Sequence, residues 1–256
     1  MSKQWFESEE FWINYAPVMF DETRWAEAPA VAQAVLDMHT ASSSKTGSCE
    51  KLSVLDAGCG MGRISVELAL LGADVTGVDI IEAELEAARE IAADEEVNIE
   101  FLNADLRSFK SEKKFDLALN LYTSFGYCDT EAEDVKILKN IYDSLKPGGT
   151  FILECTSRES AIKFWTPGET FERGGKTVTT EFHVVGDWEG LSSRWMLTDP
   201  VTKAVTDHVF TQRLYSAPEL KKILLETGYK KVEIYGGYDQ RPYNENLSTM
   251  LLLCHK

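Results

Sequence analysis

Short apolar runs alternate with longer amphipathic stretches between residues 52 and 154. Each run is bounded by polar residues and is too short for a helix, so the runs predict buried strands at 52–56, 74–79, 97–102, 115–121 and 150–154. The stretches between them carry apolar residues every three to four positions and predict helices at 64–71, 82–93 and 131–145. This alternation predicts an α/β fold: a doubly wound, parallel sheet with helices on both faces.

The flanking segments have other patterns. Residues 1–40 are rich in aromatic residues at helical spacing, with Pro29 expected in the first turn of a second helix, and 40–48 has the composition of a linker. Residues 169–214 alternate polar and apolar positions around turn dipeptides at 174–175 and 199–200, which predicts antiparallel strands. We therefore expect an N-terminal helical lid and linker (1–50) and a main domain (51–256) that carries an antiparallel insertion (157–214).

Two capping boxes and two further strands complete the expected elements. Thr130 with Glu133 opens the helix predicted at 131–145, and Ser216 with Glu219 opens another that ends at Gly228. Apolar runs at 232–235 and 249–254 then predict the last two strands.

A glycine-rich turn, V-L-D-A-G-C-G-M-G-R at 54–63, joins the first predicted strand to the first helix. Gly58, Gly60 and Gly62 leave the backbone bare, and the first N–H groups of the helix are open to a ligand. Asp56 would repel a pyrophosphate but accept hydrogen bonds from a cationic amine. The dinucleotide fingerprint G-x-G-x-x-G would require glycine where Arg63 stands, so that pattern fails.

Composition narrows the classes of partner. The formal net charge of −16, from 26 basic and 42 acidic residues, argues against nucleic acid or an anionic membrane and favours a small-molecule substrate. Five cysteines without a C-x-x-C pair predict no disulfide framework, and four histidines without ligand spacing predict no metal site. Neither a signal core nor a run of about 18 apolar residues is present, so we expect a cytoplasmic protein.

Four motifs in order carry a resemblance to a known family. They are the glycine turn preceded by Asp56, the acid Asp79 at the end of the second strand, N-A-D-L at 103–106, and L-K-P-G-G-T-F-I-L-E at 145–154. Together they span about 100 residues and resemble the class I S-adenosylmethionine-dependent methyltransferases. The resemblance implies a seven-stranded Rossmann-like sheet in the order 3-2-1-4-5-7-6, with the last strand antiparallel.

The resemblance also implies where S-adenosylmethionine would bind. Asp56 and the backbone of the turn would hold the methionine part, and Asp79 would accept the ribose hydroxyls. Other implied cofactor contacts are the turn residues Gly58, Cys59, Gly60 and Gly62, the adenine neighbours Ile80, Asp105 and Leu106, and Asn120 with Leu121 under the sulfonium. Cys59 is expected to act as a small buried residue and not as a nucleophile.

The acceptor side is expected beyond the fourth strand. The loop at 120–129 resembles that of small-molecule N-methyltransferases, which makes Tyr127 a catalytic candidate, and Tyr15 of the lid is a second. The insertion would form the substrate wall, with Trp195, Arg213, Tyr215 and Glu154 as candidate contacts. Arg213 would pair either with a substrate carboxylate or with an acid of the chain, and the insertion is also a candidate surface for a homodimer.

These features predict methyl transfer to a small nucleophile, preferably an amine, by in-line displacement. A hydroxyl acceptor would need a general base, and the sequence shows no His–carboxylate pair that would supply one. An O-methyltransferase is the alternative. Two other classes also stay open. An NAD-dependent oxidoreductase would share the turn and Asp79, and a non-catalytic module would keep the fold and bind the cofactor only.

Overall fold

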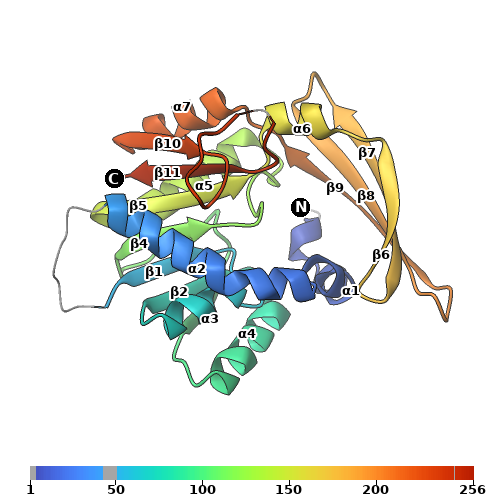
Figure 1. The fold of residues 1–256 in the computed structure, drawn as a ribbon, viewed down its shortest axis with the longest axis horizontal. Helices are drawn as coiled ribbons and strands as arrows, with labels where there is room; N and C mark the ends of the chain where they lie inside the picture. The colour runs from blue at the N-terminus through green and yellow to red at the C-terminus, as the bar shows by residue number, and fades with distance from the viewer. Residues whose placement is uncertain (1–3, 43–50, 245) are drawn as a thin grey trace.

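The computed structural model describes residues 4–42, 51–244 and 246–256 and is built on a seven-stranded sheet (Figure 1). The sheet has the order β3-β2-β1-β4-β5-β11-β10, in which β11 is antiparallel to both neighbours. This confirms the predicted order. The strands are β1 (Ser53–Ala57), β2 (Asp74–Asp79), β3 (Glu100–Asn103), β4 (Phe115–Asn120), β5 (Leu145–Cys155), β10 (Lys231–Tyr235) and β11 (Met250–His255).

Helices cover both faces of the sheet because neighbouring strand residues point to opposite sides. Val54 of β1 is buried with α2 (Glu22–Ser42) and α3 (Arg63–Leu70), whereas Leu55 is buried with α5 (Glu131–Ser144) and α7 (Ala217–Thr227). The helix α4 (Glu82–Asp94) packs on Phe101 of β3 and on Val66 of α3. The predicted capping boxes of Thr130 and Ser216 are both present.

The insertion between β5 and α7 forms a separate four-stranded antiparallel sheet in the order β6-β7-β8-β9. Its strands are β6 (Gly168–Arg173), β7 (Lys176–Val185), β8 (Gly190–Thr198) and β9 (Val205–Arg213), so the predicted β insertion is confirmed. It is preceded by an unpredicted helix, α6 (Arg158–Phe164), whose start is capped by the Ser157 hydroxyl. Seven residues are too few for a clear apolar period.

The N-terminal segment consists of the short helix η1 (Trp5–Glu7), α1 (Glu9–Met19) and α2. The start of α2 was predicted wrongly: Pro29 lies inside the helix and not in its first turn. The helix begins earlier because the Asp21 carboxylate accepts a hydrogen bond from Arg24 N at 3.1 Å. Residues 40–42 of the expected linker are still helical, and 43–50 lie outside the described residues.

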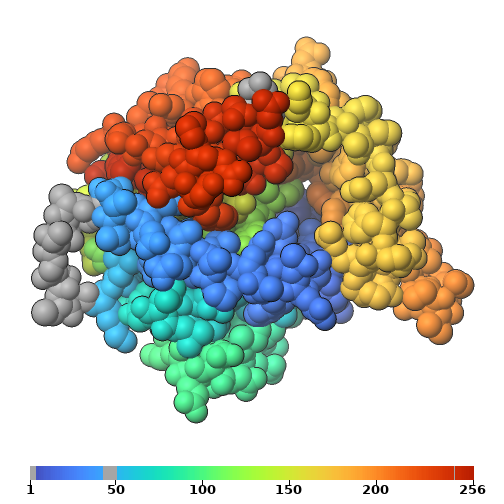
Figure 2. All heavy atoms as spheres, in the orientation of Figure 1, coloured from blue at the N-terminus to red at the C-terminus, as the bar shows by residue number. Residues whose placement is uncertain are grey.

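The N-terminal helices connect the main sheet to the insertion (Figure 2). Phe11, Tyr15 and Val18 of α1 are fully buried and pack on Val178 and Phe210 of the second sheet. On the other side, α2 packs on β1, β4 and β5. No helix of the described ranges is long and apolar enough to cross a membrane. A cavity lies where the N-terminal helices, the insertion and the carboxyl ends of the parallel strands meet.

Candidate active site

The glycine turn between β1 and α3 is held open by left-handed backbone conformations. Gly58 and Gly60 have φ angles of +81° and +52°, which side chains rarely tolerate. The turn is tied to β2 because Gly58 N and Cys59 N donate to the Val78 carbonyl at 2.7 and 3.1 Å. Gly62 is needed for packing, since a Cβ there would lie 3.0 Å from Ala88 Cβ. Gly62 is not among the residues that line the cavity, so its role in the turn is packing.

Asp79 at the end of β2 faces this turn. Its Oδ2 accepts a hydrogen bond from Gly60 N at 2.8 Å, and its Oδ1 accepts one from Ile81 N at 3.0 Å. Burial raises the pKa of Asp79 above its ordinary value, although these backbone donors oppose the shift. The carboxylate lines the cavity and keeps lone pairs for further donors.

Asp56 at the end of β1 is a second buried acid of the same wall. Its Oδ2 accepts a hydrogen bond from the Ser65 hydroxyl at 2.6 Å. Burial is the main cause that raises the pKa of Asp56 to about 6, and the charge of Asp79 adds to the shift. Asn120 lies behind the cavity wall, where its Nδ2 donates to the Ala57 carbonyl at 2.7 Å. The Oδ1 of Asn120 is buried and has no hydrogen-bond partner among the described residues.

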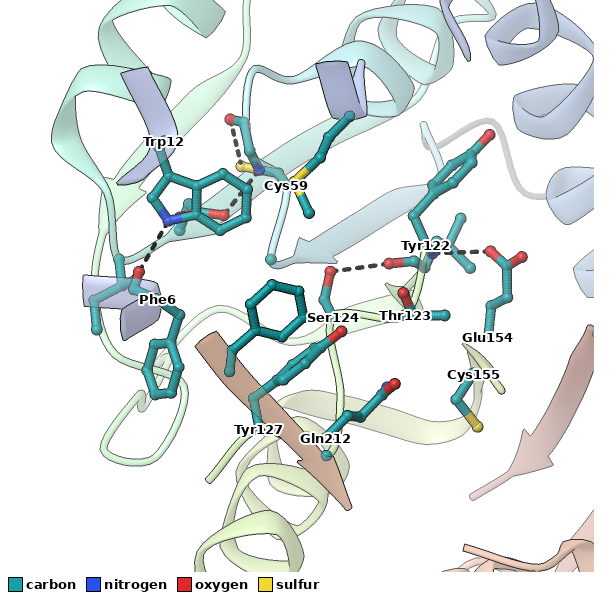
Figure 3. A pocket seen from close by; sticks show the side chains of 18 of the residues that line it. Phe6, Trp12, Cys59, Tyr122, Thr123, Ser124, Tyr127, Glu154, Cys155 and Gln212 are labelled. Atoms are coloured by element: carbon teal, nitrogen blue, oxygen red, sulfur yellow. Dashed lines mark hydrogen bonds between the residues drawn. The ribbon is translucent and has the colours of Figure 1, made fainter. Parts of the chain in front are cut away.

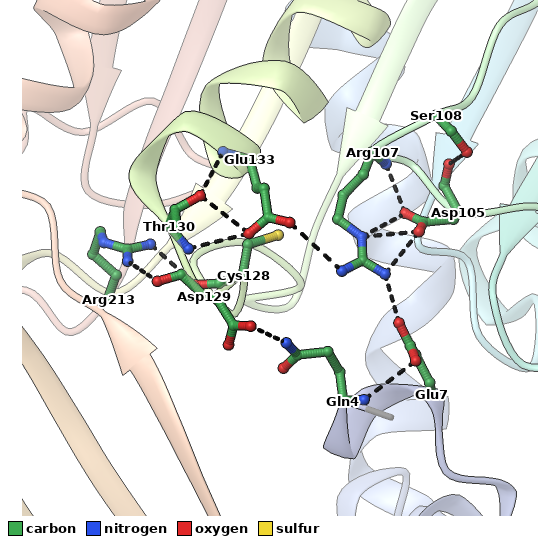
Figure 4. Close-up of polar contacts among 10 residues, drawn as sticks. All are labelled: Gln4, Glu7, Asp105, Arg107, Ser108, Cys128, Asp129, Thr130, Glu133 and Arg213. Atoms are coloured by element: carbon green, nitrogen blue, oxygen red, sulfur yellow. Dashed lines mark hydrogen bonds and ion pairs between the residues drawn. The ribbon is translucent and has the colours of Figure 1, made fainter. Parts of the chain in front are cut away.

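Asp105 follows β3 and is bound by a neighbouring arginine (Figure 4). Arg107 Nε donates to both carboxylate oxygens of Asp105 at 3.0 and 2.8 Å, and Arg107 also contacts Glu7 of η1 at 2.5 Å. Burial acts to raise the pKa of Asp105, but the hydrogen bonds and charge of Arg107 lower it overall. Gln4 donates to Asp129 at 2.6 Å and fixes η1 a second time. The N-terminal segment is thus attached at the edge of the cavity.

One cavity of about 650 Å³ connects these groups to the insertion. We define its glycine-turn half by Asp56, Gly58, Cys59, Gly60, Asp79, Ile80, Glu84, Asp105 and Leu106. We define its aromatic half by Trp5, Tyr127, Phe182, Leu191, Ser193, Trp195, Phe210 and Gln212. Leu121 and Glu154, both expected at the site, also line the cavity.

The aromatic half is built from segments that are far apart in the chain. The Trp5 ring stacks on Phe210 at 4.7 Å between centroids and contacts Tyr127 edge-on at 5.0 Å. Figure 3 shows Tyr127 and Gln212 across the cavity from Cys59. Burial raises the pKa of Tyr127 to about 12, so its hydroxyl is neutral at pH 7.

The loop after β4 crosses between the two halves in a strained conformation. Tyr122 and Thr123 have positive φ angles of 54° and 60°, which are uncommon outside glycine. Glu154 stabilises this conformation because its Oε2 accepts hydrogen bonds from Tyr122 N and from the Tyr238 hydroxyl, both at 2.8 Å. Arg63 stacks on the Tyr122 ring, 4.4 Å from its centroid. Such strain is typical of functional loops.

Besides Gly62 and Asn120, three predicted site residues lie outside the cavity wall. Tyr15 is fully buried, and its hydroxyl donates to the carbonyl of Trp195 at 2.7 Å, so it joins α1 to the second sheet. Arg213 pairs with the buried Asp134 at 2.5 Å, which is the expected alternative of an acid partner within the chain. Tyr215 donates to the same carboxylate at 2.8 Å. These polar groups are satisfied within the fold, so we remove the three residues from the ligand contacts.

Other cavity residues were not predicted. Gln212 lies one position before Arg213, and its Nε2 donates to the Phe125 carbonyl at 3.0 Å. The alternation of β9 could have indicated it, because only one of two adjacent strand residues can face the cavity. Trp5, Phe6, Trp12 and Phe20 bring the aromatic N-terminus to the wall, and Glu84 adds a buried acid. No local motif marks these positions.

Comparisons with known proteins agree with this geometry. The profile of a methyltransferase domain family matches residues 54–149. A ubiquinone biosynthesis O-methyltransferase of Rickettsia canadensis is 31% identical over 109 residues, which are 42% of this chain and 44% of that protein. The chain therefore aligns with less than half of that relative's length.

Solved structures with a similar fold cover nearly the whole chain. A S-adenosylmethionine-dependent methyltransferase of Clostridium acetobutylicum has a TM-score of 0.76 at 15% identity and covers 96% of this chain and 97% of its own. The sugar N-methyltransferase KedS8 of Streptoalloteichus has a TM-score of 0.66 at 20% identity, with 90% and 87% covered. Together with the order of the sheet, these findings show that residues 54–149 match a methyltransferase domain and that the chain has the Rossmann-like fold of the solved S-adenosylmethionine-dependent methyltransferases.

Proposed function

We propose that this protein transfers a methyl group from S-adenosylmethionine to the nitrogen of a small amine. The observation that carries the proposal is the single cavity, in which a glycine turn lined by acids adjoins an aromatic half. None of the described residues that line it is a histidine. A neutral amine needs no strong base to attack, whereas an alcohol acceptor does.

The glycine-turn half fits the cofactor. Gly58 and Gly60 leave room beside the backbone, and the buried acids Asp56 and Asp79 suit a ligand that carries cationic and hydroxyl groups. Asp105 and Leu106 would lie beside the adenine. When bound, S-adenosylmethionine supplies a methyl group that its sulfonium already activates.

The aromatic half would orient the acceptor. Since Gln212 donates its Nε2 hydrogen to Phe125, its Oε1 remains to accept an N–H of the amine. The neutral Tyr127 hydroxyl is a second hydrogen-bonding group on the same side of the cavity (Figure 3). The apolar rings of Trp5 and Phe210 exclude water around the nitrogen. Holding nucleophile and methyl donor in line at near-attack distance is the main contribution required of the protein.

O-methylation is the second candidate. The Rickettsia relative is named as an O-methyltransferase, and Glu154 is a carboxylate in the wall that would take a proton from a hydroxyl. Against this, Glu154 Oε2 already accepts two hydrogen bonds that stabilise the strained loop. KedS8 is named a sugar N-methyltransferase, which supports the proposal of an amine acceptor.

A panel of matched acceptors tests the proposal. Pairs of small molecules that differ only in an amine or a hydroxyl are incubated with the protein and a donor labelled in its methyl group. We expect label on the amine member of at least one pair and none on the hydroxyl members. Label on hydroxyl members alone would replace the proposal by O-methylation, and tight cofactor binding without transfer from a metabolite extract would favour a non-catalytic module.

A further inference from the structure

Glu84, in the first turn of α4, is a buried carboxylate without a partner. Glu84 is only 6% exposed, and its Oε2 has no hydrogen-bond partner among the described residues. None of the ion pairs between described residues includes it. Burying an unpaired carboxylate is unfavourable unless a donor satisfies it or it takes up a proton.

The carboxylate of Glu84 faces the glycine-turn half of the cavity. A Cβ added to Gly60 would lie 3.8 Å from Glu84 Oε2, so this oxygen is beside the Cα of the glycine. Asp79 holds the N–H of the same glycine at 2.8 Å. The two carboxylates therefore flank one residue of the turn, and both line the cavity.

Acids and apolar rings line the cavity together with Glu84, and none of the described cations forms an ion pair with it. Asp79 comes from β2, and Asp56 and Cys59 come from β1 and the turn. Trp12, Phe20 and Trp25, from α1, the loop after it and the start of α2, line a second pocket together with Glu84. Arg24 pairs with Glu27, and Arg63 stacks on Tyr122. Burial, followed by the charge of Asp79, raises the pKa of Glu84 to about 7.

We propose that Glu84 is a cofactor-binding residue, whose carboxylate accepts a hydrogen bond from a ribose hydroxyl of the adenosine beside Asp79. The inference rests on the proposed use of S-adenosylmethionine. Two carboxylates beside Gly60 would provide one acceptor for each of the two neighbouring hydroxyls of a ribose. Asp79 already spends one lone pair of each oxygen on the backbone, whereas Oε2 of Glu84 is unused.

A change of protonation follows from this contact. A hydroxyl donor stabilises the ionised carboxylate, so binding lowers the pKa of Glu84 and releases a proton near pH 7. The affinity for the adenosine moiety should therefore rise as the pH increases from about 6 to 8. S-adenosylhomocysteine serves as the probe because it has the same ribose and undergoes no transfer.

Titration calorimetry tests this in buffers of different ionisation enthalpy. For the wild type at pH 7 we expect release of roughly 0.5 proton per S-adenosylhomocysteine, because a group with this pKa is about half protonated there. Glu84→Gln keeps the shape of the side chain, should bind ~10-fold more weakly at pH 8 and should lose most of the proton release. Glu86→Gln, at an exposed position of the same helix, is the matched control and should behave as the wild type.

The outcomes separate the inference from the proposed function. If none of the three proteins binds S-adenosylhomocysteine, the proposed function fails. If all bind with equal affinity and equal proton release, Glu84 has no cofactor role and this inference is overturned. Competition by adenosine and its 2′- and 3′-deoxy forms adds a ligand-side test. Removal of one hydroxyl should weaken binding to the wild type more than to Glu84→Gln, and equal losses in both proteins would exclude a ribose contact.

Discussion

The two halves of the cavity differ in how the chain builds them. The glycine-turn half comes from consecutive strand–helix units, and its residues follow the carboxyl ends of β1, β2 and β3. The aromatic half combines η1, the loop after β4 and the second sheet, which meet only in the folded protein. One half is thus specified by local sequence and the other by tertiary packing. The following predictions separate the two, from the largest expected effect to the smallest.

The largest effect is expected at the buried pair behind the aromatic half. Arg213→Ala leaves the Asp134 carboxylate, which has no exposed surface, without its cation. We expect the free energy of unfolding to fall by about 3 kcal/mol, measured by denaturant titration. Arg194→Ala removes an exposed arginine of the same sheet and should change stability little. An unaffected Arg213→Ala would mean that this pair does not stabilise the wall.

Asp79→Ala tests the glycine-turn half alone. It removes the acceptor for Gly60 N and Ile81 N and the expected acceptor for the ribose. The affinity for S-adenosylhomocysteine should fall by roughly 1–3 kcal/mol, about 10- to 100-fold, in a calorimetric titration. Asp74→Ala, at the exposed start of the same strand, is the control. Equal affinities in the two variants would contradict a cofactor contact of Asp79.

Tyr127→Phe tests the aromatic half alone. Loss of the hydroxyl should leave cofactor affinity unchanged and reduce turnover about tenfold, the effect of one hydrogen bond of ~1.4 kcal/mol in the transition state. Tyr15→Phe is a matched control, because its hydroxyl bonds to the Trp195 carbonyl away from the cavity. That variant should lose stability and keep the turnover of the folded protein. Normal turnover in Tyr127→Phe would remove Tyr127 from the catalytic residues.

The smallest effect on cofactor affinity is expected at the rim of the cavity, where η1 meets Arg107. Glu7→Gln weakens the contact between η1 and Arg107 at the rim of the cavity. Since partly exposed ion pairs contribute about 0–1 kcal/mol, cofactor affinity should fall by no more than about fivefold. Measuring the dissociation rate of S-adenosylhomocysteine checks this, and an unchanged rate would show that η1 does not retain the ligand.

The buried Glu84 in the glycine-turn half should make the stability of the protein depend on pH. The folded pKa of Glu84, about 7, lies above its ordinary value of 4.5. The unfolded chain therefore loses its proton first as the pH rises, and the folded state is destabilised between about pH 5 and 8. Glu84→Gln removes this penalty. Its Tm at pH 8 without ligand should exceed that of the wild type by more than about 5 °C, measured by calorimetry. A lower Tm would contradict an unpaired carboxylate.

The sequence predicts the main sheet and much of the glycine-turn half because both follow local rules. Asp79 and Asp105 are found by their positions after apolar strands, and the left-handed Gly58 and Gly60 by the motif. Gly62 and Asn120 carry the same motif signal but serve packing and backbone hydrogen bonding. A motif identifies a position, whereas the direction of its side chain depends on the tertiary structure.

The aromatic half shows the limit of local reasoning. Arg213 and Gln212 are adjacent in β9, so the choice of which one faces the cavity depends on the register of the second sheet. Tyr15 and Trp12 of α1 belong to the same cluster against the second sheet, yet only Trp12 also lines the cavity, a difference that depends on the tertiary packing. Glu84 carries no motif, and its importance appears only from its burial without a partner.

One titration tests the central claim that the glycine-turn half is a site for S-adenosylmethionine. The wild type is titrated by calorimetry with S-adenosylhomocysteine and, separately, with NAD, because a glycine turn followed by an acid after the second strand is found in proteins that bind either ligand. We predict saturable heat with one equivalent of S-adenosylhomocysteine and no heat with NAD. Saturable heat with NAD and none with S-adenosylhomocysteine would contradict the account and favour an oxidoreductase.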